Sequence, residues 1–141
     1  MVKIAIGCDH GGISLKAEIV PLLQKLGHTV DDKGCYSTES VDYPDFAKAV
    51  CLQVQNGSCE RGILICGTGV GMSMAANRFE GIRAALCNEL FTAQMSREHN
   101  DANVLCLGAR VIGSGLAGEI VRVWVSTEFA GGRHQRRIDM F

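Results

Sequence analysis

GlyIleLeuIleCysGlyThrGlyValGly (residues 62–71) joins an uninterrupted apolar run to a turn with alternating glycines. The first half, residues 62–66, has the length and continuous hydrophobicity of a strand at the centre of a parallel sheet. The second half is too rich in glycine to continue a strand, and a helical pattern follows from about residue 71 to 78. This stretch therefore predicts a strand–turn–helix unit, the building block of an α/β fold.

The same alternation continues along the chain in both directions from this unit. Strands are predicted at residues 2–6, 28–30, 62–66, 82–87 and 103–107, and helices at 13–26, 44–55, 71–78, 89–98 and 114–127. Because parallel strands need right-handed helical crossovers, this order predicts a doubly wound, Rossmann-like, three-layer α/β/α sandwich with a five-stranded parallel sheet. The 141 residues fit one domain spanning 1–141, which ends in the basic segment 131–141.

Composition and charge exclude several classes of protein. A net charge of −1 gives no overall attraction to nucleic acid or to an anionic membrane. No apolar run approaches the roughly 20 residues that span a bilayer, and the N-terminal run is too short for a signal peptide, so a cytoplasmic location is expected. The seven cysteines are odd in number and form no Cys-x-x-Cys pair, and the histidines are scattered, so neither a disulfide framework nor a metal site is expected.

Cys66 stands where the predicted central strand enters the glycine turn. Ligands of doubly wound sheets bind at the carboxyl ends of the strands, and the backbone N–H groups of Gly67, Gly69 and Gly71 can form a cradle for negative charge there. A thiol at a helix N-terminus ionises more readily, and a thiolate in this place can serve as a general base. The alternative, a buried core thiol, is the interpretation favoured for the other six cysteines.

The first predicted strand also ends in residues suited to a ligand, in GlyCysAspHisGlyGly (7–12). Asp9 and His10 stand beside the start of a helix, where small glycines let an anion approach free amides. Asp9 as a helix cap with His10 on the surface is the alternative interpretation. A histidine next to an aspartate also suits phosphate binding or proton transfer.

Two sequence patterns partly match motifs of other protein classes. A cysteine phosphatase needs an arginine six residues after its cysteine, and that position holds Met72. Residues 113–118 match the dinucleotide pattern GxGxxG, but too little chain follows for the βαβ unit that would hold a cofactor. We interpret that segment as a helix start packed closely on the sheet.

Two polar segments remain open on their local sequence alone. ArgGluHisAsnAspAlaAsn (97–103) can be turn chemistry, or His99 among carboxylates and amides can be an acid–base group. This loop precedes the last strand, so simple topology places it at the opposite edge of the sheet from Cys66, and a second subunit would be needed to bring the two together. GlyGlyArgHisGlnArgArg (131–137) can be a solvated tail or an anion site, and Arg110 is another possible anion ligand.

Four motifs in order resemble one family: GlyCysAspHisGlyGly (7–12), IleCysGlyThrGlyValGly (65–71), ArgGluHisAsnAspAlaAsnValLeu (97–105) and GlyGlyArgHisGlnArgArg (131–137). They are similar to those of ribose-5-phosphate isomerase B and the related galactose-6-phosphate isomerase subunits. The likeness covers residues 1 to about 139. It implies an aldose–ketose isomerase that uses neither metal nor cofactor, acts through a cis-enediol(ate), and forms a homodimer, or a dimer of dimers, with sites at the subunit interface.

The resemblance also implies a role for each site residue. Cys66 would be the base, Thr68 and the amides of Gly67 to Gly71 would hold the oxyanion, and His99, with Asp9 nearby, would help to open the sugar ring. The implied phosphate ligands are His10, Arg110, Arg133 and Arg137, with His134 assisting. Tyr43 would line the pocket, and Asn100 would contact the sugar hydroxyls. The abrupt end at Phe141 departs from relatives with a longer tail.

The leading function predicted from the sequence is interconversion of ribose 5-phosphate and ribulose 5-phosphate. An isomerase of a six-carbon sugar phosphate, such as allose 6-phosphate or galactose 6-phosphate, differs only in pocket length. A non-catalytic sugar-phosphate sensor on the same fold would need the arginines and amides but no base.

Overall fold

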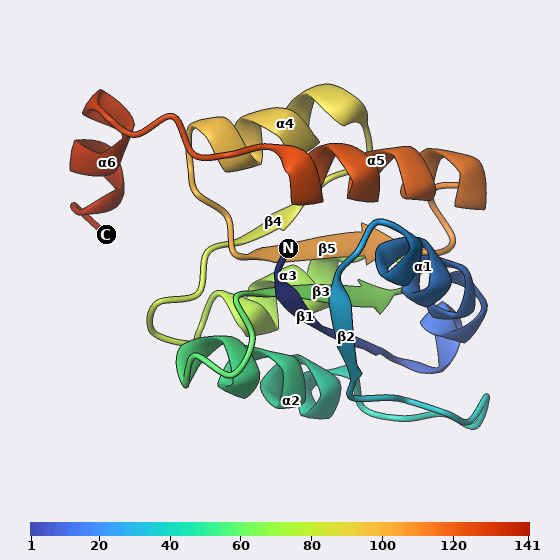
Figure 1. Cartoon of the computed structure of the whole chain (residues 1–141). Helices are drawn as coiled ribbons and strands as arrows, with labels where there is room; N and C mark the ends of the chain where they lie inside the picture. Colours follow the sequence, from blue (N-terminus) through green and yellow to red (C-terminus); the bar gives the residue numbers. More distant parts are fainter.

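A five-stranded parallel sheet separates two layers of helices in the computed structural model, which describes residues 1–141 (Figure 1). The sheet has the order β2-β1-β3-β5-β4. Its strands are β1 (Lys3–Cys8), β2 (Thr29–Asp32), β3 (Arg61–Cys66), β4 (Ala84–Leu86) and β5 (Val104–Gly108). The predicted three-layer α/β/α sandwich is confirmed.

Helices cover both faces of this sheet. Those helices are α1 (Ile13–Lys25), α2 (Tyr43–Gln55), α3 (Val70–Ala76), α4 (Leu90–Glu98) and α5 (Ser114–Ser126), whereas α6 (Arg133–Ile138) lies at the amino edge of the sheet (Figure 1). Buried residues of α1, α4 and α5 share one core cluster with the sheet, and those of α2 and α3 share the other. Because apolar layers cover both faces, the central strands are buried along most of their length.

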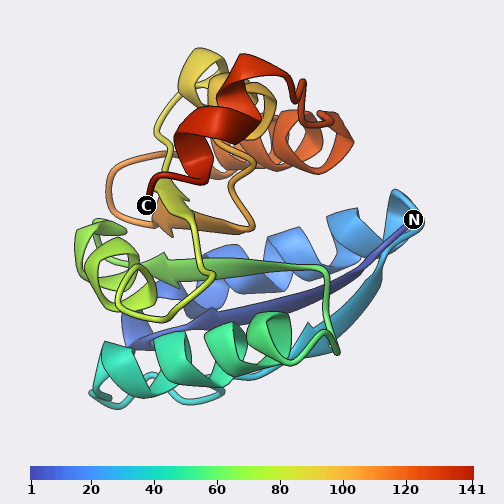
Figure 2. The ribbon, with the colours of Figure 1, turned by 90° about the vertical axis from the view of Figure 1, so that its left-hand side faces the viewer.

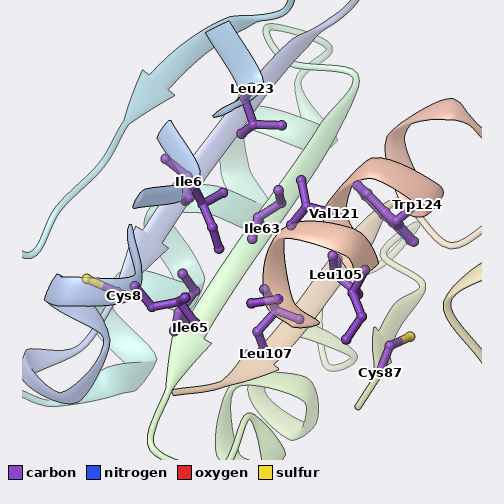
Figure 3. Packing of buried hydrophobic residues seen from close by; sticks show 14 of the residues in the cluster. Ile6, Cys8, Leu23, Ile63, Ile65, Cys87, Leu105, Leu107, Val121 and Trp124 are labelled. Atoms are coloured by element: carbon purple, nitrogen blue, oxygen red, sulfur yellow. The ribbon is translucent and has the colours of Figure 1, made fainter. Parts of the chain in front are cut away.

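The larger core lies under α5 (Figure 3). Ile63 and Leu105 of the two central strands pack there with Val121 and Trp124, all with no exposed surface. Alternate strand residues, such as Leu64, face the α2 and α3 layer. The uninterrupted apolar runs in the sequence therefore follow from burial on both faces.

The chain changes direction between β1 and β3. β1 and β3 are hydrogen-bonded neighbours in this order. After β1 the chain crosses to β2 on one side of this pair, and after β3 it crosses to β4 on the other side. Loops that leave adjacent strands in opposite directions open a crevice at the carboxyl edge of a parallel sheet. Asp9 and Gly67 follow the two strands at that point.

Three sequence predictions need correction. β2 extends to Asp32, beyond the predicted 28–30, because Asp31 and Asp32 pair with β1 as an edge strand and the Lys16 ammonium neutralises the Asp32 carboxylate at 2.8 Å. The segment 131–141 is not merely a tail but contains α6. The glycines at the start of α5 are not required for close packing on the sheet, because no atom lies within 4 Å of a Cβ placed on Gly113 or Gly115, and α5 instead meets the core through Ala117.

All seven cysteines are free and buried, as the sequence predicts for all but Cys66. Burial raises the pKa of Cys8 and of Cys51 to about 12, so these two thiols stay protonated at neutral pH. None of the helices combines the length and the hydrophobicity needed to cross a membrane.

Candidate active site

The Cys66 side chain lies at the carboxyl end of β3 with only 5% of its surface exposed. Its Sγ accepts a hydrogen bond from the Gly69 amide at 3.1 Å. A backbone donor at this distance stabilises negative charge on sulfur. Gly69 can point its amide back toward the sulfur because its φ of 79° is in the left-handed region that favours glycine.

The loop after Cys66 forms the predicted cradle of backbone donors. The amides of Gly67, Thr68 and Gly71 donate to no other group of the chain, so they can bind an oxyanion. Thr68 is exposed, and its hydroxyl accepts a hydrogen bond from the Val70 amide at 3.2 Å. The cradle therefore presents both N–H and O–H donors next to the thiol.

Two close approaches fix the shape of this cradle. A Cβ placed on Gly108 would lie 2.6 Å from the Thr68 carbonyl oxygen, and one on Gly71 would lie 2.7 Å from Cζ of Tyr43. Gly108 supports the loop from β5, whereas Tyr43 covers it from the start of α2. Tyr43 is thus a direct neighbour of the cradle. The role of Gly108 escaped the sequence analysis, because nothing local to it reveals which loop it supports.

Asp9 and His10 lie at the end of β1, across the crevice from Cys66. One carboxylate oxygen of Asp9 accepts the Gly11 amide at 2.9 Å, and the side chain is 9% exposed. His10 Nδ1 accepts the Val41 amide at 3.2 Å. In the neutral ring the proton is then on Nε2, which can donate to an anion.

Arg110 approaches the crevice from the loop after β5. A Cβ placed on Gly11 would lie 3.8 Å from the Gly67 nitrogen and 3.9 Å from Nη2 of Arg110. The exposed guanidinium therefore stands beside the cradle and the His10 turn. These contacts form the carboxyl-end group, which consists of Asp9, His10, Tyr43, Cys66, Gly67, Thr68, Gly69, Gly71 and Arg110.

The other predicted site residues lie at the opposite edge of the sheet. His99 and Asn100 follow α4 and precede β5, so they stand at its amino end, where α6 also lies (Figure 1). The His99 and His134 rings stack with centroids 4.2 Å apart and an interplanar angle of 12°. Viewed from this edge, α6 stands in front of α4 and α5 (Figure 2). The amino-end group is His99, Asn100, Arg133, His134 and Arg137.

Electrostatics favour an anion at the amino-end group. Partial desolvation, the neighbouring His99 and the Arg133 and Arg137 guanidinium groups all lower the pKa of His134 below its ordinary 6.5. The ring is therefore mostly neutral at neutral pH, which allows it to stack on His99 without like-charge repulsion. Arg133 and Arg137 are exposed and form no ion pair within the chain.

One chain therefore holds two half-sets of site residues at opposite edges of the sheet. The topology expected for His99 is confirmed, and the arginines of α6 are on its side rather than beside His10 and Arg110. No three His, Cys, Asp or Glu side chains converge in a way that could hold a metal ion. Chemically, the carboxyl-end group offers a base and an oxyanion cradle, and the amino-end group offers imidazoles and cations.

Residues 4–141 match the family model described as Ribose/Galactose Isomerase. This chain belongs to the ribose/galactose isomerase family. Nearly its full length is shared with relatives in that family. A protein of Escherichia coli strain K12 named ribose-5-phosphate isomerase B is 55% identical over 139 residues, covering 99% of this chain and 93% of that protein.

Solved structures and a further relative refine this placement in the isomerase family. The structure of ribose-5-phosphate isomerase B from Clostridium thermocellum is similar with a TM-score of 0.96 and 56% identity, covering 98% of this chain and 93% of that one. A Pectobacterium atrosepticum protein named D-erythrulose-4-phosphate isomerase is 45% identical over 140 residues, covering 99% of this chain and 92% of that protein. The family thus includes members named for different sugar phosphates.

Proposed function

We propose that this chain is an aldose–ketose isomerase that interconverts ribose 5-phosphate and ribulose 5-phosphate, with Cys66 as the base. The observation that supports it best is the Cys66 sulfur, which accepts the Gly69 amide within a loop that also carries free amides, in the crevice of a ribose/galactose isomerase fold. Moving a proton between adjacent carbons requires one base and stabilisation of the charge that develops on the neighbouring oxygens. The carboxyl-end group offers both within one loop.

The proposed chemistry follows from this arrangement. The Cys66 thiolate removes the proton from C2 of the open-chain aldose, and the electrons of the C–H bond form the C1–C2 double bond of a cis-enediolate. The amides of Gly67 and Gly71 and the Thr68 hydroxyl hold the negative oxygen. The thiol then returns the proton to C1, the hydroxyl proton passes from O2 to O1, and the ketose results. No atom is gained or lost.

The amino-end group, together with Asp9, His10 and Arg110 of the carboxyl-end group, supplies the remaining functions in this proposal. His99, with Asp9 from across the interface, helps to open the furanose ring, Asn100 contacts sugar hydroxyls, and the phosphate lies among cations. Its proposed ligands are His10, Arg110, Arg133, Arg137 and His134. Because one chain holds the two groups at opposite edges, we infer that a homodimer forms each site from the carboxyl-end group of one chain and the amino-end group of its partner.

Apolar side chains beside the cradle support this inference. Val70 and Met74 of α3 and Phe91 of α4 are 43%, 67% and 67% exposed. Large exposed apolar residues are common at interfaces between subunits. Val70 and Met74 lie on the helix that continues the loop after Cys66, and Phe91 lies in the first turn of α4, at the same carboxyl edge of the sheet, which suits a partner that carries the amino-end group.

The first experiment measures conversion of ribose 5-phosphate to ribulose 5-phosphate by the purified chain in EDTA. Turnover is expected without added metal. Allose 6-phosphate, galactose 6-phosphate and D-erythrulose 4-phosphate are tested in parallel, and faster turnover of one of these would replace the proposed substrate. Tight binding of sugar phosphates without turnover of any would instead favour a sensor.

A second experiment tests the composite site by mixing two inactive variants. Cys66→Ala and His99→Asn each damage a different half of the site. If subunits exchange freely, half of the dimers are mixed and each has one intact site, so about a quarter of the wild-type activity should return. Mixed Cys66→Ala and Thr68→Ala chains, which damage the same half, are the control. Activity that stays absent in the first mixture, despite exchange shown by mass spectrometry of the dimers, would contradict the shared site.

A further inference from the structure

Arg97 is a buried arginine near the end of α4, two residues before His99. Only 5% of its surface is exposed. Its Nε donates to the Thr127 carbonyl at 3.1 Å, and its Nη1 donates to the Asp101 carboxylate at 2.9 Å and to the Ala102 carbonyl at 2.6 Å. A guanidinium is rarely buried so deeply, and here every bond leads to the segments around His99 or to the chain after α5.

Asp101 has an unusual backbone that these bonds explain. Its φ of 46° makes it the one non-glycine residue of the chain with a positive φ. Arg83 reaches it from the start of β4, with Nε 2.9 Å from its carbonyl oxygen and Nη2 3.4 Å from its carboxylate. Asp101 is thus held by Arg97 on one side and Arg83 on the other. A strained backbone persists only where several contacts determine it, and this one lies two residues after His99, just beyond the end of α4.

The same end of α4 is bonded to the chain that leads to α6. Thr127 begins that connection, and further along it the Ala130 amide donates to the Glu98 carbonyl at 3.0 Å. Neither His99 nor His134 makes a side-chain hydrogen bond within the chain, although their rings stack. The separation of the two rings is therefore determined by the backbone on either side, and Arg97 joins those two backbones.

We propose that Arg97, with Asp101 as its partner, is the positioning residue of the amino-end group. It holds the His99 loop and the connection to α6 at the separation at which the imidazoles stack. The effect of Arg97 on catalysis rests on the proposed function. If loss of Arg97 misplaces His99, opening of the sugar ring slows, whereas proton transfer by Cys66 on an open-chain sugar does not.

The chain offers a matched control in Arg61. This arginine is also partly buried and donates to two carbonyls at the end of α5, Trp124 at 3.0 Å and Val125 at 3.2 Å. Both arginines stand over the Trp124 ring, Arg61 at 5.4 Å and Arg97 at 5.9 Å. Arg61 bonds to neither the His99 loop nor the connection to α6. Arg61→Lys therefore perturbs the same helix end and the same indole without touching the amino-end group.

The experiment compares Arg97→Lys with Arg61→Lys in three measurements on the full chain. Conversion of ribose 5-phosphate, which must open its ring, should fall about tenfold or more in Arg97→Lys, because small misplacements of a reacting group are costly. Deuterium uptake from D2O into ribulose 5-phosphate, which is already open, should stay within about threefold of wild type at saturating substrate. The imidazole NMR signals of His99 and His134 should move in Arg97→Lys and not in Arg61→Lys.

Asp101→Gly provides a second variant in case Arg97→Lys does not fold. Glycine suits a φ of 46°, which offsets part of the stability lost with the carboxylate that Arg97 holds, so the variant should fold and still lose conversion rate. Equal rates and unmoved histidine signals in Arg97→Lys or in Asp101→Gly would overturn the proposal. If the wild type neither converts nor exchanges, the proposed function fails, and the histidine signals alone decide whether Arg97 positions the pair.

Discussion

The two edges of the sheet hold their site residues by different means. At the carboxyl edge, Cys66 and Asp9 each accept a backbone amide from two or three residues away, and both are nearly buried. At the amino edge, His99 is exposed and stacks on His134 of a helix that follows 35 residues later. The first group is built from the ends of central strands, whereas the second depends on side chains and on the connection between two helices.

This difference bears on how each edge tolerates change. A backbone cradle keeps its shape as long as the strands beneath it stay packed, because the core positions its donors. An exposed group of imidazoles and guanidiniums keeps its geometry only through the contacts that join α4 to α6. We therefore expect the largest functional effects at the carboxyl edge and graded ones at the amino edge.

Removing the sulfur of Cys66 should have the largest effect. Cys66→Ala should lower kcat by roughly 10²–10⁴-fold, the usual contribution of a positioned base, with little change in substrate affinity. Isothermal titration with the sugar phosphate and a steady-state assay separate the two quantities. Cys59→Ala, which removes a buried thiol in the turn before β3 at the amino edge, serves as the control. Equal losses in the two variants would contradict the role of Cys66.

Distorting the cradle through Gly108, which supports it from β5, should have the next largest effect. In Gly108→Ala the new methyl would lie 2.6 Å from the Thr68 carbonyl, so kcat/KM should fall about tenfold or more and stability by about 1–3 kcal/mol. Gly115→Ala adds a methyl in open space within α5 and should raise stability by up to about 1 kcal/mol at unchanged rate. Denaturant unfolding and the isomerase assay check both, and an unaffected rate in Gly108→Ala would show that the loop adapts.

The smallest predicted effect concerns the charge of His134. Its pKa is lowered in the folded chain, so the unfolded chain binds a proton more readily, and this residue's contribution to stability is lost as pH falls below about 6.5. Arg137→Gln removes one of the causes and should raise the NMR titration midpoint of His134 toward its ordinary value. Arg136→Gln, on the same helix but not among those causes, should leave the midpoint unchanged. Equal midpoints in both variants would remove Arg137 from the explanation.

The carboxyl edge was largely predictable from the sequence for a physical reason. Residues 62–71 hold a continuous apolar run and then alternating glycines, so both the strand and its turn are visible in neighbouring residues. The rule that ligands bind at carboxyl ends of parallel strands then places Cys66 and Asp9 at one crevice. Their contacts are local in sequence, which is what a sequence pattern can report.

The amino edge was less predictable because its contacts are distant in sequence. α6 is only six residues long and buries Ile138 alone, so its sequence lacks the periodic apolar residues from which a helix can be predicted. The stacking of His99 on His134 and the bond from Arg97 to Thr127 join residues about 30 positions apart. The extension of β2 through Asp31 and Asp32 was missed similarly, since the buried Lys16 that neutralises Asp32 comes from α1.

The seven buried thiols give this chain an internal reporter of its own opening motions. Four lie in or directly after β1, β3, β4 and β5, one lies in the loop after β2, one in α2 and one in the turn that follows α2, and no disulfide joins any pair. A brief pulse of alkylating reagent, followed by mass spectrometry of the peptides, would therefore record which segment had separated from the core at that moment. Cys59 reports on the turn between α2 and β3, whereas Cys106, in the middle of β5, becomes reactive only when the layer of α2 and α3 separates from the sheet.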